Sequence, residues 1–268
     1  MAAMNDFTAQ LARAPAVLVT VDAAEGSAPR ERGAWMAVFA NDVIGTVGGG
    51  QLEFQAIAEA RRRLQSPQGT DVLRYPLGPS LGQCCGGVMH LRFENVSAAD
   101  VPVLTTRLAS GAMPVALFGG GHVGRALARV LADLPVALAW IDSRDEIFPA
   151  GTPPHVQCEH SDPVQGAVPQ LAPQSRVVIM SFSHAEDLDI VAACLRRIRE
   201  RDDLPYVGLI GSKTKWATFR HRLEERGFTA DELARITCPI GVPGIDGKEP
   251  EVIAVAVAAQ LLQTRQAR

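Results

Sequence analysis

Apolar and polar positions follow a regular pattern from about residue 114 onward. Short runs that are apolar throughout alternate with segments of helical length, as expected for a parallel sheet that is buried on both faces. The predicted strands are Val115–Phe118, Val136–Ile141, Val177–Ser181 and Tyr206–Ile210. The predicted helices are Val123–Leu134, Leu188–Glu200, Trp216–Arg226 and Pro250–Leu262. We therefore expect a Rossmann-like parallel sheet with helices on both faces.

The first part of the chain has a different pattern. Trp35–Phe39 and Val43–Val47 predict a hairpin, and Ala16–Val21 and Val88–Phe93 predict further strands. Leu52–Leu64 has no Gly or Pro inside it and predicts a helix. These elements indicate a smaller mixed α+β domain. We place the boundary near residue 112, which gives domains 1–112 and 113–268.

Composition excludes several classes of protein. The 268 residues are 47% hydrophobic and 21% charged, with a net charge of -3, which indicates a globular chain and argues against nucleic-acid binding. The most apolar helical stretch is shorter than the ~20 residues of a membrane span, and the N-terminal segment lacks a signal-peptide pattern. Five cysteines do not form a disulfide framework, so we expect a cytoplasmic protein, with Cys158, Cys194 and Cys238 in the core.

A dinucleotide-binding fingerprint follows the first strand of the second domain. Gly119, Gly121 and Gly124 fit G-x-G-x-x-G between a predicted strand and a predicted helix, with His122 at the helix start. Asp142 ends the next strand and has the position of an acid that binds ribose, whereas Arg144 suits a 2′-phosphate. The pattern is therefore compatible with NAD(P), although glycines that serve packing alone would produce it too.

Two loops of the first domain contain further candidate residues. Gly48, Gly49 and Gly50 precede a helix, where free amides and the helix dipole favour an anion, and Arg30 is a planar donor suited to phosphate. Gly82–Gly87 contains Cys84 and Cys85 between glycines. Amide donors around a loop thiol stabilise the thiolate, which binds soft metals.

These segments together resemble the XdhC/CoxI family, the accessory proteins of xanthine dehydrogenase and related molybdenum hydroxylases. The resemblance covers nearly the whole chain. The matching segments are Gly26–Arg30, Gly45–Glu53, Gly82–Gly87, Phe118–Gly124, Trp140–Arg144, Tyr206–Lys215, Cys238–Gly241 and Lys248–Pro250.

The resemblance implies a non-catalytic chaperone that binds the molybdenum cofactor (molybdopterin), holds it while a cysteine desulfurase adds the sulfido ligand, and delivers it to the apo-hydroxylase. It adds Gln51, Ser212 and Lys213 to the candidate cofactor-binding residues. Our hypothesis is that Cys84 or Cys85 touches the molybdenum. We also expect a homodimer. The alternative function is an NAD(P)-dependent oxidoreductase that uses the fingerprint.

Overall fold

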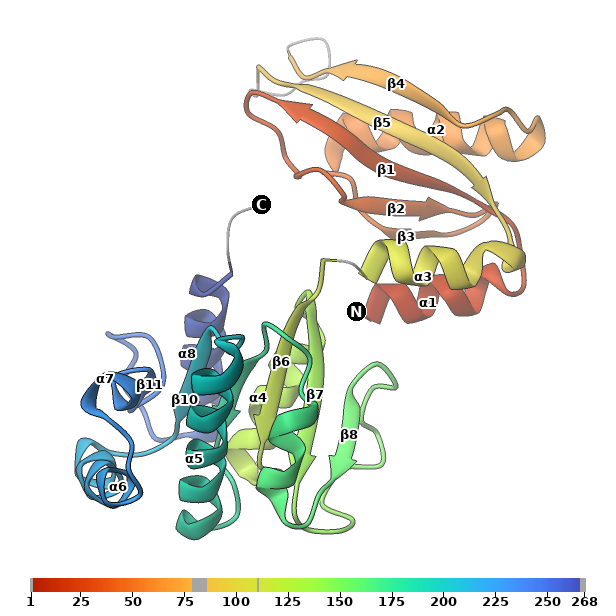
Figure 1. Cartoon of the computed structure of the whole chain (residues 1–268). Helices are drawn as coiled ribbons and strands as arrows, with labels where there is room; N and C mark the ends of the chain where they lie inside the picture. The colour runs from red at the N-terminus through yellow and green to blue at the C-terminus, as the bar shows by residue number, and fades with distance from the viewer. Residues whose placement is uncertain (1, 79–85, 110, 266–268) are drawn as a thin grey trace. The chain divides into compact units, whose positions relative to one another are not determined.

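The structure, a computed structural model, describes residues 2–78, 86–109 and 111–265. Contacts within the chain divide it into two compact units, Ala2–Ser110 and Gly111–Arg268. Each unit has its own sheet and its own helices (Figure 1).

The N-terminal unit contains a five-stranded antiparallel sheet with the order β3-β2-β1-β5-β4. Its strands are β1 (Ala16–Glu25), β2 (Trp35–Val38), β3 (Val43–Gly45), β4 (Asp71–Pro76) and β5 (Val88–Val96). The central strand β1 pairs with β2 on one side and β5 on the other, so that Val17 lies opposite Val38 and Val19 opposite Phe93. The predicted hairpin is confirmed as the β2–β3 pair.

Helices cover both faces of this sheet. They are α1 (Ala2–Leu11), α2 (Gly50–Gln65) and α3 (Val101–Ala109), with a short 3-10 turn, η2 (Ala98–Asp100), before α3. Side chains alternate along β1, so Val17 and Val19 pack with α2, whereas Leu18 packs with α1 and α3. Figure 1 shows α1 and α3 side by side and α2 along the sheet.

The C-terminal unit contains a six-stranded parallel sheet with the order β11-β10-β9-β6-β7-β8. Its strands are β6 (Met113–Phe118), β7 (Val136–Asp142), β8 (Gln157–His160), β9 (Arg176–Ile179), β10 (Tyr206–Leu209) and β11 (Ile236–Thr237). The chain adds β7 and β8 on one side of β6 and then β9, β10 and β11 on the other. The strand order therefore reverses between β6 and β9, which is where doubly wound sheets bind ligands.

Helices cover both faces of this sheet as well. On one face, α4 (His122–Ala132) and α8 (Pro250–Gln263) pack on Val115, Leu117 and Leu138. The other face is covered by η3 (Val164–Gln170), α5 (His184–Arg201), α6 (Lys213–Glu225) and α7 (Ala230–Leu233). The predicted fold class is confirmed in both units. Within the part of the chain that the structure describes, no helix is both long and apolar enough to cross a membrane.

Three edge strands, β4, β8 and the two-residue β11, were not predicted from the sequence. Most positions of β4 and all four of β8 are exposed, so neither has an apolar run. Cys158 lies on β8, and the prediction that it is buried is wrong for this reason. Cys194 is buried in α5 as expected, and Cys238, which follows β11, is half-buried.

Candidate functional site

The loops that follow the parallel strands form one edge of the C-terminal sheet. Gly119–Gly121 follows β6, Asp142 ends β7 and is followed by Ser143 and Arg144, residues 180–183 follow β9, and Ser212 precedes α6. The fold therefore brings together segments that lie up to about ninety residues apart in the sequence. This edge is the expected position of a ligand crevice in a doubly wound domain.

Glycine occupies the fingerprint positions for two different structural reasons. A Cβ on Gly119 would overlap the carbonyl of Met180, and a Cβ on Gly124 would overlap the carbonyl of Gly119. Close packing therefore requires glycine at both positions. At Gly121 nothing lies within 4 Å of such a Cβ, and the φ of -67° suits any residue. Packing does not explain this glycine, whereas the approach of a ligand to the backbone would.

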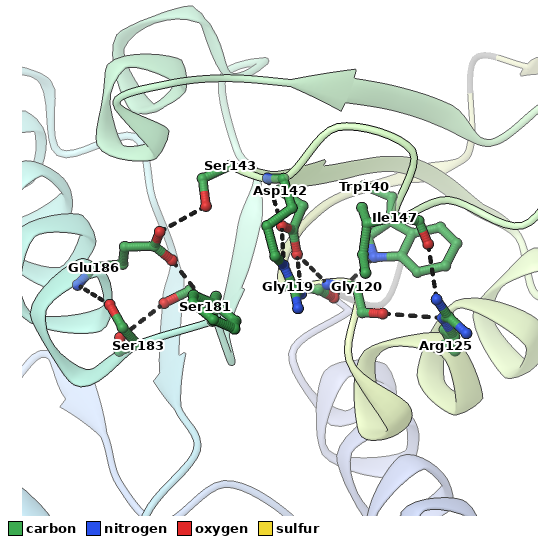
Figure 2. A network of polar contacts seen from close by, with 12 residues as sticks. Gly119, Gly120, Arg125, Trp140, Asp142, Ser143, Ile147, Ser181, Ser183 and Glu186 are labelled. Atoms are coloured by element: carbon green, nitrogen blue, oxygen red, sulfur yellow. Dashed lines mark hydrogen bonds and ion pairs between the residues drawn. The ribbon is translucent and has the colours of Figure 1, made fainter.

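The glycine loop is held in place by side chains on both sides (Figure 2). The indole Nε1 of Trp140 donates to the Gly119 carbonyl at 2.9 Å. Arg125, on α4, donates through Nε to the Gly120 carbonyl at 3.1 Å and through Nη2 to the Ile147 carbonyl at 3.0 Å. These bonds fix the loop after β6 to the loop after β7.

Asp142 is buried at the end of β7 and binds the chain's own donors. Oδ2 accepts from the Gly120 amide at 2.6 Å and from Arg144 Nη2 at 2.9 Å, and Oδ1 accepts from the Arg144 amide and Nε, both at 2.9 Å. Burial acts to raise the pKa of Asp142. The hydrogen bonds from Arg144 and Gly120 outweigh burial and hold this pKa below its usual value.

A polar network continues from this loop to the start of α5. Ser143 Oγ donates to Glu186 Oε1 at 2.6 Å, and Glu186 Oε2 accepts from the Phe182 amide at 3.1 Å (Figure 2). The Arg144 guanidinium lies 4.6 Å from the centroid of the Phe182 ring, which is 65% exposed. Neither Glu186 nor Phe182 was predicted as a site residue from the sequence.

Other predicted residues lie on exposed helix starts. His122 begins α4 and is exposed. Ser212 is the N-cap of α6 and accepts from the Lys215 amide at 3.1 Å, and Lys213 has no polar partner among the described residues. His184 begins α5, with its ring 6.3 Å from that of Phe219.

An ion pair near the β9 and β10 loops was also missed. Lys215 Nζ lies 2.6 Å from Asp187 Oδ2 and donates to the Ile210 carbonyl at 2.9 Å. Asp187 Oδ1 accepts from both the amide and the hydroxyl of Ser181. The local signal was weak, since a Lys and an Asp 28 residues apart have no characteristic spacing.

The glycine loop of the N-terminal unit differs from its prediction. The amide of Gly49 donates to Glu53 Oε2 at 3.1 Å, and the amide of Gly48 donates to Thr46 Oγ1 at 3.2 Å. Glu53 Oε2 also accepts from the Val47 amide at 3.0 Å and from Thr46 Oγ1 at 2.5 Å. The amides of Gly48 and Gly49 are therefore not free for an anion. Gly50 and Gln51 begin α2 and are exposed.

Three of the family segments meet in this unit. A Cβ on Gly48 would lie 2.5 Å from Pro29 Cγ, and the Arg30 side chain is adjacent to it. A Cβ on Gly87 would overlap the carbonyls of Glu25 and Ser27. The 26–30 segment thus packs against both the 45–53 segment and the end of the cysteine segment. Cys84 and Cys85 lie outside the described residues.

Arg30 is a charged residue at the contact between the 26–30 and 45–53 segments. Its side chain is exposed and has no hydrogen bond or ion pair with the residues that the structure describes. Gly49 and Gly86 have nothing within 4 Å of a Cβ. Within ranges 2–78, 86–109 and 111–265, no group of three His, Cys, Asp or Glu side chains is placed to hold a metal. The predicted residues fall into two sets, one in each unit.

Together these features define a Rossmann-domain protein with a second, antiparallel domain that contains its own glycine loop. Residues 115–261 match the family model described as the XdhC Rossmann domain, and residues 9–76 match that of the XdhC and CoxI family. The chain therefore belongs to the XdhC/CoxI family, whose XdhC proteins are accessory factors.

Two known proteins show the extent of the similarity. YqeB of Escherichia coli K12, which is uncharacterized, is 26% identical over 263 residues, covering 94% of this chain and 44% of YqeB. The chain thus spans less than half the length of this relative. A crystal structure from Bacillus halodurans, described as a xanthine dehydrogenase, is similar in fold with a TM-score of 0.77 at 20% identity. It covers 98% of this chain and is itself covered over 96% of its length.

Proposed function

We propose that this protein acts in the maturation of xanthine dehydrogenase or a related molybdenum hydroxylase, by binding the molybdenum cofactor and delivering it. The observation that carries this proposal is the packing of segment 26–30 against both 45–53 and 86–87, with Arg30 exposed and without a polar partner among the described residues. Membership of a family of accessory factors supports the same role. In this role the cofactor is a cargo that is bound and released, and the chain needs no catalytic residue.

Each part of the cofactor has a chemically suitable partner in the N-terminal unit. The phosphate suits the Arg30 guanidinium, a planar donor that stays charged at all physiological pH values. Gly50 and Gln51, at the exposed start of α2, provide backbone amides in the same unit. The sulfur-rich, metal-containing end suits a soft thiolate, which is the role proposed for Cys84 or Cys85.

The direct test isolates the full-length protein anaerobically from a cofactor-producing host and measures the bound pterin phosphate by mass spectrometry. Arg30→Ala should reduce retention about ten- to a hundredfold, because a hydrogen bond to a charged group contributes about 1.5–3 kcal/mol. Arg13→Ala, which removes another exposed arginine of the same unit, is the matched control. Failure to find the cofactor on the wild-type protein would contradict the proposal.

The cysteines are tested separately. Replacing both Cys84 and Cys85 by Ser should lower cofactor retention and the activation of the apo-hydroxylase. Cys158→Ser, which removes an exposed thiol of the other unit, should leave both unchanged. Equal retention and activation in the double variant would remove the thiols from the proposal.

The proposed function takes place in the cytoplasm. It requires three protein partners, namely the apo-hydroxylase, the cysteine desulfurase and a second copy of this chain. Exposed apolar side chains on α8 support the homodimer. Val255 and Leu262 on α8 are 52% and 38% exposed, although most of this helix packs on α4. Light scattering on the purified protein tests the dimer, and Val255→Asp should shift it to monomer.

A further inference from the structure

Asp142 has the sequence position of a ribose-binding acid but the surroundings of an internal residue. An ionised carboxylate has about four lone-pair positions. Here four donors bind it at 2.6–2.9 Å, namely the Gly120 amide, the Arg144 amide, and Nε and Nη2 of Arg144. Its side chain is 1% exposed. No acceptor position is left for the hydroxyls of a ribose.

Arg144 is also engaged by this pair, although its side chain is 32% exposed. A 2′-phosphate would be bound by an arginine whose guanidinium is turned toward the ligand. Instead, Nε and Nη2 of Arg144 are both directed at Asp142, and the guanidinium lies over the Phe182 ring. Arg144, which would favour NADP, and Asp142, which would favour NAD, are therefore paired with each other.

The loop after β7 also covers the middle of the fingerprint. Gly120 is buried, and a Cβ placed on it would lie 2.7 Å from Ile147 Cγ1 and 3.3 Å from Asp142 Oδ2. Arg125 holds this arrangement by binding the carbonyls of both Gly120 and Ile147 (Figure 2). Ile147 and Asp142 therefore lie against Gly120 on the side of β6 and β7, where the adenosine half of a dinucleotide would bind.

We propose that Asp142 and Arg144 are specificity-determining residues that exclude NAD(H) and NADP(H) from the Rossmann domain, so that the fingerprint is retained for packing and for a different ligand. A dinucleotide would have to break a doubly hydrogen-bonded ion pair whose carboxylate is buried. It would then leave Arg144 without its partner, because a ribose diol carries no charge to replace the carboxylate. This inference does not depend on the nature of the cargo.

The test measures the binding of NADH and NADPH to the full-length protein by isothermal titration calorimetry. The wild-type protein should bind neither at the concentrations that saturate ordinary dehydrogenases. Arg144→Ala frees one acceptor position on each oxygen of Asp142, so its affinity for NADH should rise at least tenfold above the wild-type limit. NADPH should gain nothing, because its 2′-phosphate would face an uncompensated carboxylate.

Two controls keep the result interpretable. Arg129→Ala removes an exposed arginine from α4 and should bind neither nucleotide. Arg144→Gln keeps a long polar side chain, and it replaces Arg144→Ala if thermal unfolding shows that the alanine variant is not folded. Tight NADH or NADPH binding by the wild type would overturn the proposal. So would a folded Arg144 variant that gains no affinity for NADH.

Discussion

At the scale of single residues, the stability of the C-terminal unit depends on the charge of Asp142. The folded state holds the pKa of this carboxyl below the value of about 3.9 that it has in an unfolded chain. The corresponding stability is fully present above the unfolded pKa, and it is lost as the pH falls through the folded pKa.

Asp142→Asn should therefore lower the free energy of unfolding at neutral pH by about 3 kcal/mol, since it leaves Arg144 without its charged partner. The variant should also lose less stability than the wild type between pH 5 and acid conditions, about pH 2. Urea unfolding across this range measures both effects. Asp246→Asn, at an exposed loop position, is the control and should follow the wild-type curve. Parallel curves for wild type and Asp142→Asn would show that this carboxyl is not the origin of the acid sensitivity.

The fingerprint glycines give a second residue-scale prediction, because only some of them are required for packing. Gly124→Ala should cost about 3 kcal/mol, since the new Cβ would overlap the Gly119 carbonyl in the turn before α4. Gly121→Ala should cost about 1 kcal/mol or less, the usual difference between Gly and Ala at an N-cap. Thermal unfolding of the two variants separates them, and equal losses would contradict this division of roles.

The sequence predicted where these residues lie but not what they bind. Glycine spacing and the acid about 20 residues later are local signals, and both are confirmed as features of a strand–turn–helix unit. The partners of Asp142 depend on how the 143–147 loop returns over Gly120, which no spacing rule encodes. For the same reason, the sequence could not show that Glu53 occupies the amides of the first glycine loop.

At the scale of elements, prediction succeeded where burial imposes a pattern. β6, β7, β9 and β10 lie in the interior of the parallel sheet, and each was visible as an apolar run. β4 and β8 are edge strands whose side chains are mostly exposed, so only their pairing with β5 and β7 defines them. Backbone pairing leaves no hydrophobic signature in the sequence, which is why these strands were missed.

The start of α2 illustrates how one side chain holds two elements together. Glu53, in the first turn of the helix, accepts from Thr46 and from the amides of Val47 and Gly49. A carboxylate at this position also interacts favourably with the helix dipole. Glu53 thereby fixes the loop between β3 and α2.

Glu53→Gln should lower the free energy of unfolding of the N-terminal unit by about 2 kcal/mol, because one neutral carbonyl replaces an ionised oxygen with three donors. Chemical denaturation with hydrogen-exchange detection on residues 43–60 would locate the effect. Glu31→Gln changes an exposed glutamate of the same unit and should alter stability by less than about 0.5 kcal/mol. If Glu53→Gln behaved like this control, the carboxylate would not organise the loop.

At the scale of the whole molecule, the two units have separate hydrophobic cores. The clusters around Leu91 and Leu18 contain only residues of the N-terminal unit, and those around Leu127 and Leu195 only residues of the C-terminal unit. A cavity in one core therefore removes contacts from that unit alone.

Leu91→Ala and Leu127→Ala should each destabilise one unit by about 2–5 kcal/mol, because both side chains are fully buried. In hydrogen exchange, Leu91→Ala should reduce the protection of peptides from residues 16–96 and leave those from 113–263 unchanged, and Leu127→Ala should do the reverse. Global loss of protection in both variants would mean that the chain unfolds as one cooperative body. Selective loss would mean that a variant that weakens one unit leaves the other folded. The binding of the cofactor or of a nucleotide to one unit could then be measured without interference from the other.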